Sequence, residues 1–381
     1  MTPDRKMDMN KPPESSSKPL IPQFRPYVDK SDYAYLERVF EHHHIAEGRY
    51  AKEFQQQLLN IIGSRYGCFA SNGTLALYLA LRAAGIKPGD EVIVQDITFV
   101  ASANAVEMVG ARPVFADIRE YNDITIDLER VKISENTKAM IVCPLFGTAC
   151  GNIEQIVTFC RTHNIILVED AAQALAIRGA SGHCGTFGTV GTFSFYADKI
   201  ITTGEGGFVV TNDETVYERM LYLRNQGRKK NGTFVHPEIG FNFRITDIQA
   251  CLGLSQLQKL ETIIREKQKI YAAYRSSLGD SVEYLLLRDD FTHIPFRVVI
   301  FVEDAERVVK CLAQKGIELR SMFYPLHMQP CYRHLGYPDS NYPNSMACFK
   351  KGICLPTWVG LSEKQIYQVA EAVREALKSQ V

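Results

Sequence analysis

The sequence predicts an α/β protein with a large domain built on a mostly parallel sheet and a second, smaller domain. Apolar runs typical of strands alternate with helical runs between residues 66 and 225. These runs are continuously apolar, as in Ile165-Ile-Leu-Val168, which indicates strands covered on both faces. At 381 residues the chain is long enough for one large core and a second, smaller one.

The composition argues against several classes of partner. Hydrophobic residues make up 46% of the chain and charged residues 23%, and the 43 basic and 43 acidic residues cancel. A net charge of zero gives no electrostatic reason to expect a nucleic acid or a membrane surface as partner. No stretch approaches the about 20 apolar residues of a membrane span, and the N-terminus has no apolar signal core. We therefore expect a soluble, cytoplasmic protein.

The cysteines and histidines do not form a metal-binding pattern. None of the ten cysteines forms a C-x-x-C pair, and several lie inside apolar runs. This pattern is typical of buried thiols in a reducing compartment. His42, His43 and His44 are adjacent on one element, so they cannot all face one ion. We expect no metal site.

The N-terminal part begins with a polar segment rich in proline and serine, which predicts a disordered tail over residues 1–20. Two helices separated at Gly48 are predicted over residues 31–62. A short strand from Tyr66 then leads into Ser71-Asn-Gly-Thr74 and a helix that ends at Gly85. A strand, a small-residue turn and a helix form an arrangement that can bind an anion, although such turns also occur as plain helix caps.

The following part places candidate residues at the ends of predicted strands. In such sheets, ligands bind at the carboxyl ends of the strands. Phe99, Asp170 and Lys199 each come at or just after an apolar run. Strands are predicted over residues 91–95, 113–117, 139–144, 165–169, 192–196 and 208–211, and helices over residues 98–109, 153–163 and 215–225.

The second domain is predicted from a change of pattern beyond residue 227. Apolar residues spaced by three and four predict one long helix from about Thr246 to Leu278. Shorter mixed elements follow from about Gly279, and an amphipathic helix is predicted over residues 363–377. We place the large domain at residues 21–255 and a smaller α+β domain at residues 256–381.

Lys199 has two interpretations when it is considered alone. Its neighbours Ala197, Ile200 and Ile201 are apolar or small, and desolvation would leave the amine neutral often enough to attack a carbonyl. A solvated lysine at the end of a strand is the other interpretation. Asp170 likewise suits either a partner for a buried cation or an N-cap.

Considered together, these residues fit one cofactor. Pyridoxal phosphate requires a lysine for a Schiff base, an acid at the ring nitrogen, an apolar face for the ring and a phosphate site. Lys199, Asp170, Phe99 and the turn at residues 71–74 meet these requirements, and Ser194 adds a phosphate contact.

The chain resembles the DegT/DnrJ/StrS family of sugar aminotransferases from about Ile21 to the C-terminus. The resemblance implies a fold-type-I, aspartate-aminotransferase-like architecture. The motifs that carry it are Ser71-Asn-Gly-Thr-Leu-Ala-Leu77, Gly89-Asp-Glu-Val92, Thr98-Phe-Val-Ala101, Glu169-Asp-Ala-Ala-Gln-Ala174, Phe193-Ser-Phe195 with Lys199, Thr203-Gly-Glu-Gly-Gly207, Gly240-Phe-Asn-Phe-Arg244 and Pro325-Leu-His-Met-Gln-Pro330.

The resemblance implies a role for each matching residue. Lys199 would bind the cofactor and move a proton, and Asp170 would keep the pyridine nitrogen protonated. Asn242 would reach the phosphate of the neighbouring subunit, so that the active unit would be a homodimer. The remaining cofactor contacts would be Phe99 on the ring, Gln173 on its 3-oxygen, and Gly73, Thr74 and Ser194 on the phosphate.

The same resemblance implies the reaction. Lysine at position 199 favours transamination, whereas the dehydratase branch of the family has histidine there. The sequence Ile200-Ile-Thr-Thr-Gly-Glu-Gly-Gly207 resembles enzymes that act on the 4-keto carbon of a nucleotide-linked deoxy sugar, with glutamate as donor. Arg244 and the basic residues 228–230 are candidates for substrate phosphates, and His327 for the sugar. A solvated loop and a satisfied histidine are the alternatives.

Two departures from the family pattern leave the sugar open. Leu175-Ala176 replaces the usual His-Gly, and Pro144-Leu-Phe-Gly147 replaces His-Leu-Tyr-Gly. Both changes remove polar groups near the expected pocket. A 3-keto or non-nucleotide sugar therefore stays possible. So does a regulator that binds pyridoxal phosphate without turnover, against which the intact lysine, acid and phosphate turn argue.

Overall fold

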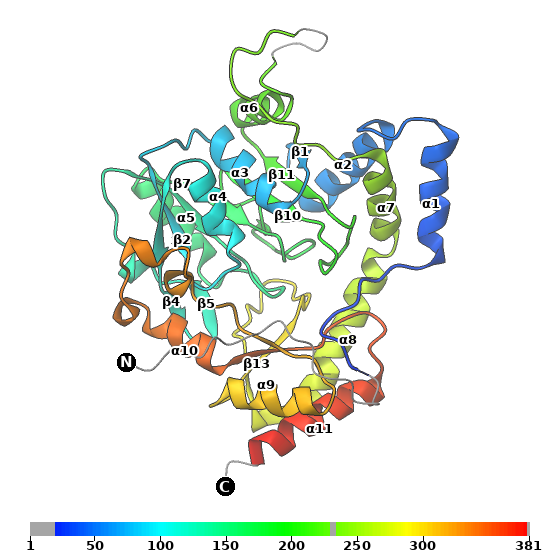
Figure 1. Ribbon diagram of the computed structural model, residues 1–381, viewed down its shortest axis with the longest axis vertical. Helices are drawn as coiled ribbons and strands as arrows, with labels where there is room; N and C mark the ends of the chain where they lie inside the picture. Colours follow the sequence, from blue (N-terminus) through cyan, green and yellow to red (C-terminus); the bar gives the residue numbers. More distant parts are fainter. Residues whose placement is uncertain (1–19, 229–233, 379–381) are drawn as a thin grey trace.

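A seven-stranded mixed sheet forms the centre of the computed structural model, which describes residues 20–228 and 234–378 (Figure 1). Strand β11 runs antiparallel to both of its neighbours, whereas the strands from β10 to β3 run parallel to one another. This arrangement confirms the α/β class with a mostly parallel sheet. In order across the sheet, the strands are β1 (Tyr66–Ala70), β11 (Gly207–Thr211), β10 (Val190–Ser194), β7 (Ile166–Asp170), β6 (Thr137–Val142), β2 (Glu91–Gln95) and β3 (Arg112–Ala116).

Helices cover both faces of this sheet, because alternate residues of a strand point to opposite sides. In β2, Val92 and Val94 belong to one buried cluster and Ile93 to the other. This burial on both faces explains why the strands are apolar throughout. The first cluster contains α3 (Gly73–Ala83), α4 (Ala101–Met108) and α6 (Glu214–Arg224), and the second contains α2 (Arg49–Ile62), α5 (Ile153–Thr162) and α7 (Asp247–Gln258).

The predicted helix over residues 246–278 is wrong in one respect, because the structure divides it into α7 and α8 (Leu260–Leu278). The two helices meet at Lys259, whose Nζ donates to Asp32 Oδ2 of α1 (Lys30–Glu41) at 2.8 Å. Helix α7 packs on α1 and α2, whereas α8 packs on α11 (Glu363–Lys378). The break at Lys259 therefore allows one continuous apolar pattern to pack against two different sets of helices.

The C-terminal lobe has a sheet and a hydrophobic core of its own. The expected boundary after residue 255 falls inside α7, one turn before the break at Lys259. In order, the strands of the second sheet are β12 (Glu283–Tyr284), β13 (Val298–Phe301), β15 (Gly352–Leu355) and β14 (Arg320–Ser321), and the lobe also contains α9 (Ala305–Gln314) and α10 (Pro343–Lys351).

The segment before α1 lies against this C-terminal lobe, although it comes first in the chain (Figure 1). Ile21 pairs with Ile317, and the Gln23 side chain donates to the Leu355 carbonyl at 3.1 Å. The Trp358 indole N–H donates to the Pro22 carbonyl at 3.1 Å. Residues 21–23 therefore belong to the core of the C-terminal lobe. The predicted disordered tail, apart from residue 20, lies outside the described residues.

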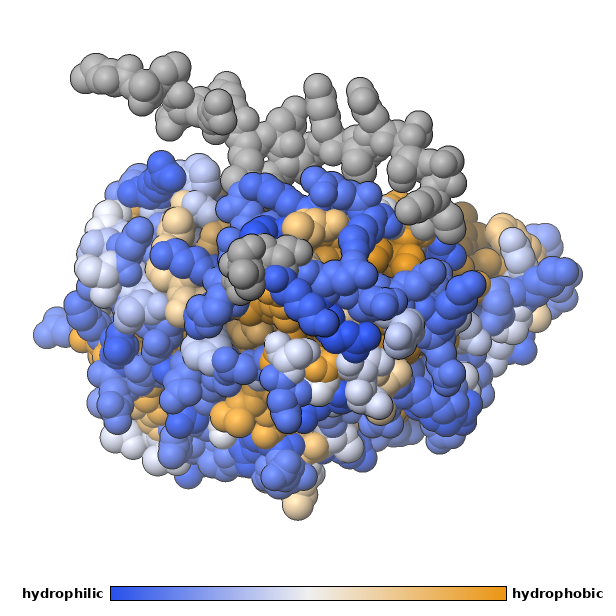
Figure 2. Space-filling model, turned by 90° about the horizontal axis from the view of Figure 1, so that it is seen from below, coloured by the Kyte–Doolittle hydropathy of each residue, from blue (hydrophilic) through white to orange (hydrophobic). Residues whose placement is uncertain are grey.

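Short strands and 3₁₀ turns complete the structure. The face of the molecule seen in Figure 2 is mostly hydrophilic, with scattered apolar patches. None of the helices in residues 20–228 and 234–378 is both long enough and apolar enough to cross a bilayer. The remaining strands are β4 (Ile118–Glu120), β5 (Asp123–Ile126), β8 (Arg178–Gly179) and β9 (Gly182–His183), and the 3₁₀ turns are Leu128–Arg130, Gly279–Ser281, Leu326–Met328, Arg333–Leu335 and Asp339–Asn341.

Candidate active site

The predicted site residues come together at the carboxyl edge of the central sheet. Asp170 is the last residue of β7, and the parallel strand β10 places Thr192 opposite it. Ser194 ends β10, and Lys199 follows in the next turn, where its N–H donates to the Tyr196 carbonyl at 3.0 Å. The parallel pairing of the two strands thus brings the acid and the lysine to the same edge.

Asp170 is buried and held by two donors. The Ser102 hydroxyl donates to Oδ2 at 2.7 Å, and the Ala172 N–H donates to Oδ1 at 3.3 Å. Burial raises the pKa of Asp170, while Ser102, Ala172 and the charge of Lys199 oppose the rise. A buried carboxylate in this position is suited to a cationic partner such as a protonated ring nitrogen.

Ser102 is a site residue that the sequence interpretation missed. It lies in the first turn of α4, directly after the Thr98-Phe-Val-Ala101 motif. The helix predicted from residue 98 begins only at Ala101, so Phe99 stays in the turn before it. Nothing in the spacing of α4 alone shows that this hydroxyl faces β7, because that depends on how the helix packs.

Lys199 has a largely enclosed amine with a perturbed pKa, although its side chain is 16% exposed. Its Nζ lies 3.8 Å from Asp198 Oδ1 and 4.8 Å from the centre of the Phe296 ring. Burial lowers the pKa of Lys199, and the charges of Asp198 and Asp170 oppose that effect. A larger fraction of this amine is therefore neutral, and nucleophilic, than of an exposed lysine.

The start of α3 and the end of β10 lie in contact where we predict that the phosphate binds. The Asn72 side chain caps α3 by accepting from the Leu75 N–H at 2.9 Å. The amides of Gly73 and Thr74 occupy the first turn, where a helix offers no internal acceptor. A Cβ on Gly73 would lie 2.9 Å from Ser194 Cβ, so the turn and the strand are in close contact. These amides, with the Ser194 hydroxyl nearby, suit a phosphate group.

Two further residues bound the space for a ring. Phe99 is 56% exposed, with its ring centre 6.1 Å from that of Phe323. An exposed aromatic face in this turn is available for stacking. Gln173 is buried, and its Oε1 accepts from the Phe146 N–H at 2.7 Å. The side-chain NH2 of Gln173 is then the group that can donate to a ring oxygen.

One departure from the family pattern, at Phe146, lies next to this space through its hydrogen bond to Gln173, and the other, at Ala176, follows Gln173 by three residues in the chain. Phe146 and Ala176 have φ angles of 55° and 66°, in the left-handed region that favours glycine. The Phe146 ring stacks on Phe323 at 5.4 Å between centres, and the Ala176 N–H donates to His183 Nε2 at 2.9 Å. At Phe146 an apolar ring thus takes the place of the expected tyrosine, and Ala176 adopts a backbone conformation that suits the glycine expected there.

The structure places the remaining predicted residues at the margin of this group or outside it. Asn242 is exposed and forms an isolated bridge with Asn225. Arg244 is also exposed, and its carbonyl accepts from the Ser71 hydroxyl at 3.2 Å beside the phosphate turn. Arg228 donates to Asn225, whereas residues 229 and 230 lie outside the described part of the chain.

His327 does not have the exposure that a contact with the sugar requires. Its side chain has no exposed surface, Nδ1 lies 2.8 Å from Asp96 Oδ2, and its N–H donates to Asp96 Oδ1 at 2.9 Å. The ring also stacks on Tyr342, with 4.1 Å between centres. Asp96 directly follows β2, so we assign His327 a structural role that holds the turn carrying Phe99.

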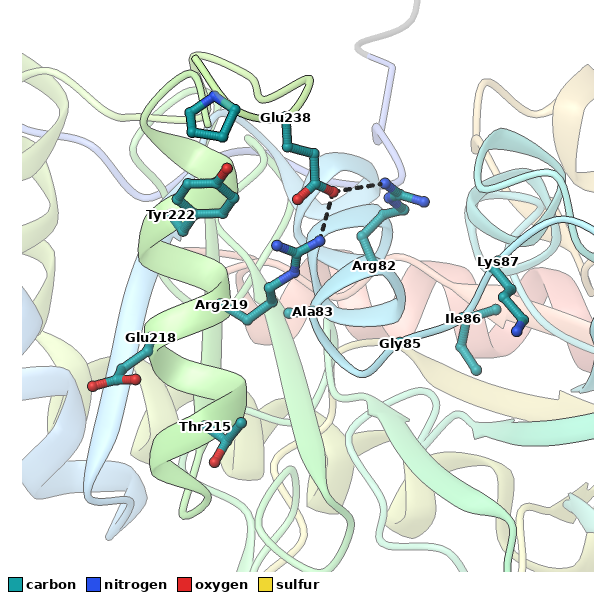
Figure 3. A pocket seen from close by; sticks show the side chains of 11 residues that line it. Arg82, Ala83, Gly85, Ile86, Lys87, Thr215, Glu218, Arg219, Tyr222 and Glu238 are labelled. Atoms are coloured by element: carbon teal, nitrogen blue, oxygen red, sulfur yellow. Dashed lines mark hydrogen bonds and ion pairs between the residues drawn. The ribbon is translucent and has the colours of Figure 1, made fainter. Parts of the chain in front are cut away.

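A separate cavity at the surface lies away from these residues. It measures about 840 Å³ and is bounded by α3, α6 and Glu238 (Figure 3). Arg82 and Arg219 both point at Glu238 Oε1, at 3.5 and 2.5 Å (Figure 3). None of the predicted site residues lines this cavity, so its size gives no argument for the reaction.

Comparison with known proteins agrees with this geometry. Residues 26–374 match the DegT/DnrJ/EryC1/StrS aminotransferase family. The chain is 36% identical to the GDP-perosamine synthase of Escherichia coli O157:H7 over 361 residues, which cover 93% of this chain and 98% of that protein.

Solved structures of similar proteins share the fold. The aminotransferase TlmJ from Streptoalloteichus hindustanus has a TM-score of 0.89 at 28% identity, covering 95% of this chain and 100% of that one. Spr1654 from Streptococcus pneumoniae, solved in its PLP form, has a TM-score of 0.87 at 26% identity, covering 96% and 99%. The lysine, the acid and the phosphate turn fit the same cofactor. The chain therefore belongs to the DegT/DnrJ/EryC1/StrS aminotransferase family and is a pyridoxal phosphate-dependent sugar aminotransferase.

Proposed function

We propose that this enzyme transfers an amino group from glutamate to the 4-keto carbon of a nucleotide-linked deoxy sugar. The observation that carries the proposal is that Lys199 and Asp170 lie at one edge of the sheet with the phosphate turn, where the charge of each affects the other. The choice of a nucleotide-linked sugar follows the name of the relative that is 36% identical over nearly its whole length, and the choice of the 4-keto carbon follows the resemblance carried by residues 200–207.

Each residue of the site has its own role in the proposed reaction. When bound, pyridoxal phosphate supplies an aldehyde that can carry the amino group and a ring that takes up electrons. Lys199 Nζ, kept partly neutral by burial, acts as nucleophile and then holds and returns the proton at the reacting carbon. Asp170 keeps a proton on the ring nitrogen, and Ser102 fixes the carboxylate. The amides of Gly73 and Thr74 hold the phosphate.

We further propose a homodimer in which Asn242 acts in the partner's site. Asn242 is exposed in the single chain, on a segment that also exposes the apolar side chains Phe234, Val235 and Ile239 by 91%, 71% and 79%. Such surface is costly in water and suits burial against a second copy. Mixing Lys199→Ala and Asn242→Ala chains tests this, because one intact shared site per mixed dimer should restore activity that neither variant has alone.

A cytoplasmic location is part of the same proposal. All ten cysteines are free thiols, and eight of them are buried. Free buried thiols suit a reducing compartment.

The main experiment incubates purified protein with pyridoxal phosphate, glutamate and a panel of 3-keto and 4-keto sugar nucleotides. We expect an aminated product, detected by mass, from a 4-keto substrate. A product only from 3-keto substrates would correct the carbon position. No product from any substrate would contradict the nucleotide-sugar assignment.

The variant Lys199→Ala tests the chemistry itself. It should lose both the visible absorption of the bound cofactor and the half-reaction with glutamate, because the nucleophilic amine is gone. Absorption spectroscopy measures both, and retention of either would contradict the role of Lys199.

A further inference from the structure

A second set of buried charges lies behind Lys199, and the proposed reaction does not use it. Asp198, Arg297 and Lys267 are each less than 10% exposed. Asp198, Lys199 and Lys267 line one small cavity of about 20 Å³, which has room for about one water molecule. Buried charges are costly unless they are paired, so this cluster needs a physical account.

Arg297 fixes the carboxylate of Asp198 through one oxygen only. Arg297 donates to Asp198 Oδ2 at 2.7 Å. Asp198 Oδ1 is buried and accepts no hydrogen bond from the described residues, and its neighbour is Lys199 Nζ at 3.8 Å. The same Nζ lies 4.8 Å from the centre of the Phe296 ring. A carboxylate oxygen and an aromatic face both attract an ammonium ion.

We propose that Asp198 is a positioning residue that holds the protonated form of the free Lys199 amine over Phe296 when that amine is not bonded to the cofactor. Arg297 keeps the carboxylate in place from the other side. This role rests on the function proposed for Lys199. It gives the amine a defined resting position and a proton to deliver.

The surrounding charges set the direction of the effect. Asp198 and Asp170 favour the charged form of Lys199, whereas burial and Arg297 disfavour it. Lys267, from α8, faces the same cavity and donates to the carbonyls of Phe296 and Thr357 at 3.4 and 3.2 Å. Burial lowers its pKa to about 7. Arg25 also lines the cavity.

Two variants that break the same ion pair should act in opposite directions. Asp198→Asn removes an anion beside Lys199, so the pKa of the amine should fall by about 1–3. Arg297→Gln removes a cation and frees Asp198 for Lys199, so the pKa should rise. A loss of local structure common to both variants would shift the pKa of Lys199 in the same direction in both. Opposite shifts in the pKa of Lys199 would therefore distinguish an electrostatic effect from a loss of local structure.

The measurement follows the free amine directly. The full chain, freed of cofactor or loaded with pyridoxamine phosphate, is treated with a small acylating reagent from about pH 6 to about pH 10. Peptide mass spectrometry then gives the rate of modification at Lys199. We expect at least about tenfold faster modification of Asp198→Asn near neutral pH and slower modification of Arg297→Gln. Asp32→Asn, which breaks the distant buried pair with Lys259, should leave the rate unchanged.

An unchanged pKa of Lys199 in Asp198→Asn, or shifts of the same sign in both variants, would overturn the proposal. The cofactor-free measurement needs no turnover, so it stays decisive if the substrate assignment fails. Loss of the visible absorption in Lys199→Ala tests the separate question of whether Lys199 binds the cofactor. If Asp198→Asn does not fold, the sign of the shift in Arg297→Gln still decides between the two explanations.

Discussion

The contact between Gly73 and Ser194 allows a sharp test of the phosphate site. In Gly73→Ala, the new Cβ would lie 2.9 Å from Ser194 Cβ and 3.0 Å from its Oγ. Carbon atoms pack best at about 3.5–4.0 Å, so the start of α3 or the end of β10 must move. Such overpacking costs about 1–3 kcal/mol. If the binding site bears the cost, the Kd for pyridoxal phosphate rises by about 5–150-fold.

A second substitution identifies the clashing atom. Replacing Ser194 by glycine removes Cβ and Oγ and leaves Ser194 Cα as the nearest of the neighbouring atoms, at 3.7 Å from the new methyl group. Ser194→Gly alone should weaken binding, because a phosphate contact is lost. The double variant should bind more tightly than the sum of the two single effects predicts. Gly151→Ala is a matched control, because its Cβ meets nothing nearer than 3.4 Å.

Titration of the cofactor-free variants with pyridoxal phosphate, followed by absorption, measures these affinities. Thermal unfolding of each variant separates a damaged site from a damaged fold. Wild-type affinity in Gly73→Ala would refute the placement of the phosphate between α3 and β10. Strict additivity in the double variant would refute the clash as the cause.

Three further predictions concern buried groups. Ser102→Ala removes the 2.7 Å hydrogen bond to Asp170, so the pKa of Asp170 should rise. The half-reaction with glutamate should then slow by about 10–150-fold. An unchanged dependence of its rate on pH would contradict this role of Ser102. His327→Ala leaves the buried carboxylate of Asp96 without the hydrogen-bond partner in the ring and should cost about 1–3 kcal/mol in denaturant unfolding, whereas an intact stability with a raised KM for the sugar would restore the substrate role. Lys267 has a pKa of about 7 in the folded protein, against 10.5 for an ordinary lysine. Between these two pH values the unfolded chain binds more protons than the folded protein. The free energy of unfolding should therefore fall as the pH drops from about 10 to about 7. Lys267→Met should remove that part of the pH dependence, and identical slopes for the two proteins would show that the lysine stays charged in the fold.

Much of the large domain could be predicted from the sequence, because its pattern is local. Strands buried on both faces are recognisable as apolar runs, and their ends point to Asp170 and Lys199 without knowledge of the sheet order. The boundaries differ by a few residues, as for the helix expected from residue 98 that begins at Ala101. The apolar spacing gives no sign of the break at Lys259, where the side chain contacts Asp32 more than two hundred residues away.

The parts of the site that the sequence did not reveal depend on tertiary packing. Ser102 reaches Asp170 only through the packing of α4 on the central sheet, and Arg297 meets Asp198 from the other lobe. His327 occurs in a family motif that invites a substrate role, yet its ring is enclosed by Asp96 and Tyr342. A motif therefore identifies a residue of interest, whereas burial decides what that residue can touch.

The pairing of Ile21 with Ile317 has a consequence for the order in which the protein matures. Residues 24–27, next to this pairing, form one wall of the cavity behind Lys199, and residues 357–359 form another. A chain emerging from the ribosome can fold its central sheet early, but it cannot close that wall until the last tenth of the polypeptide has been made. Contacts so distant in sequence close slowly. The pocket for the nucleophilic amine is thus completed at the end of synthesis, which would delay cofactor capture until both lobes have formed.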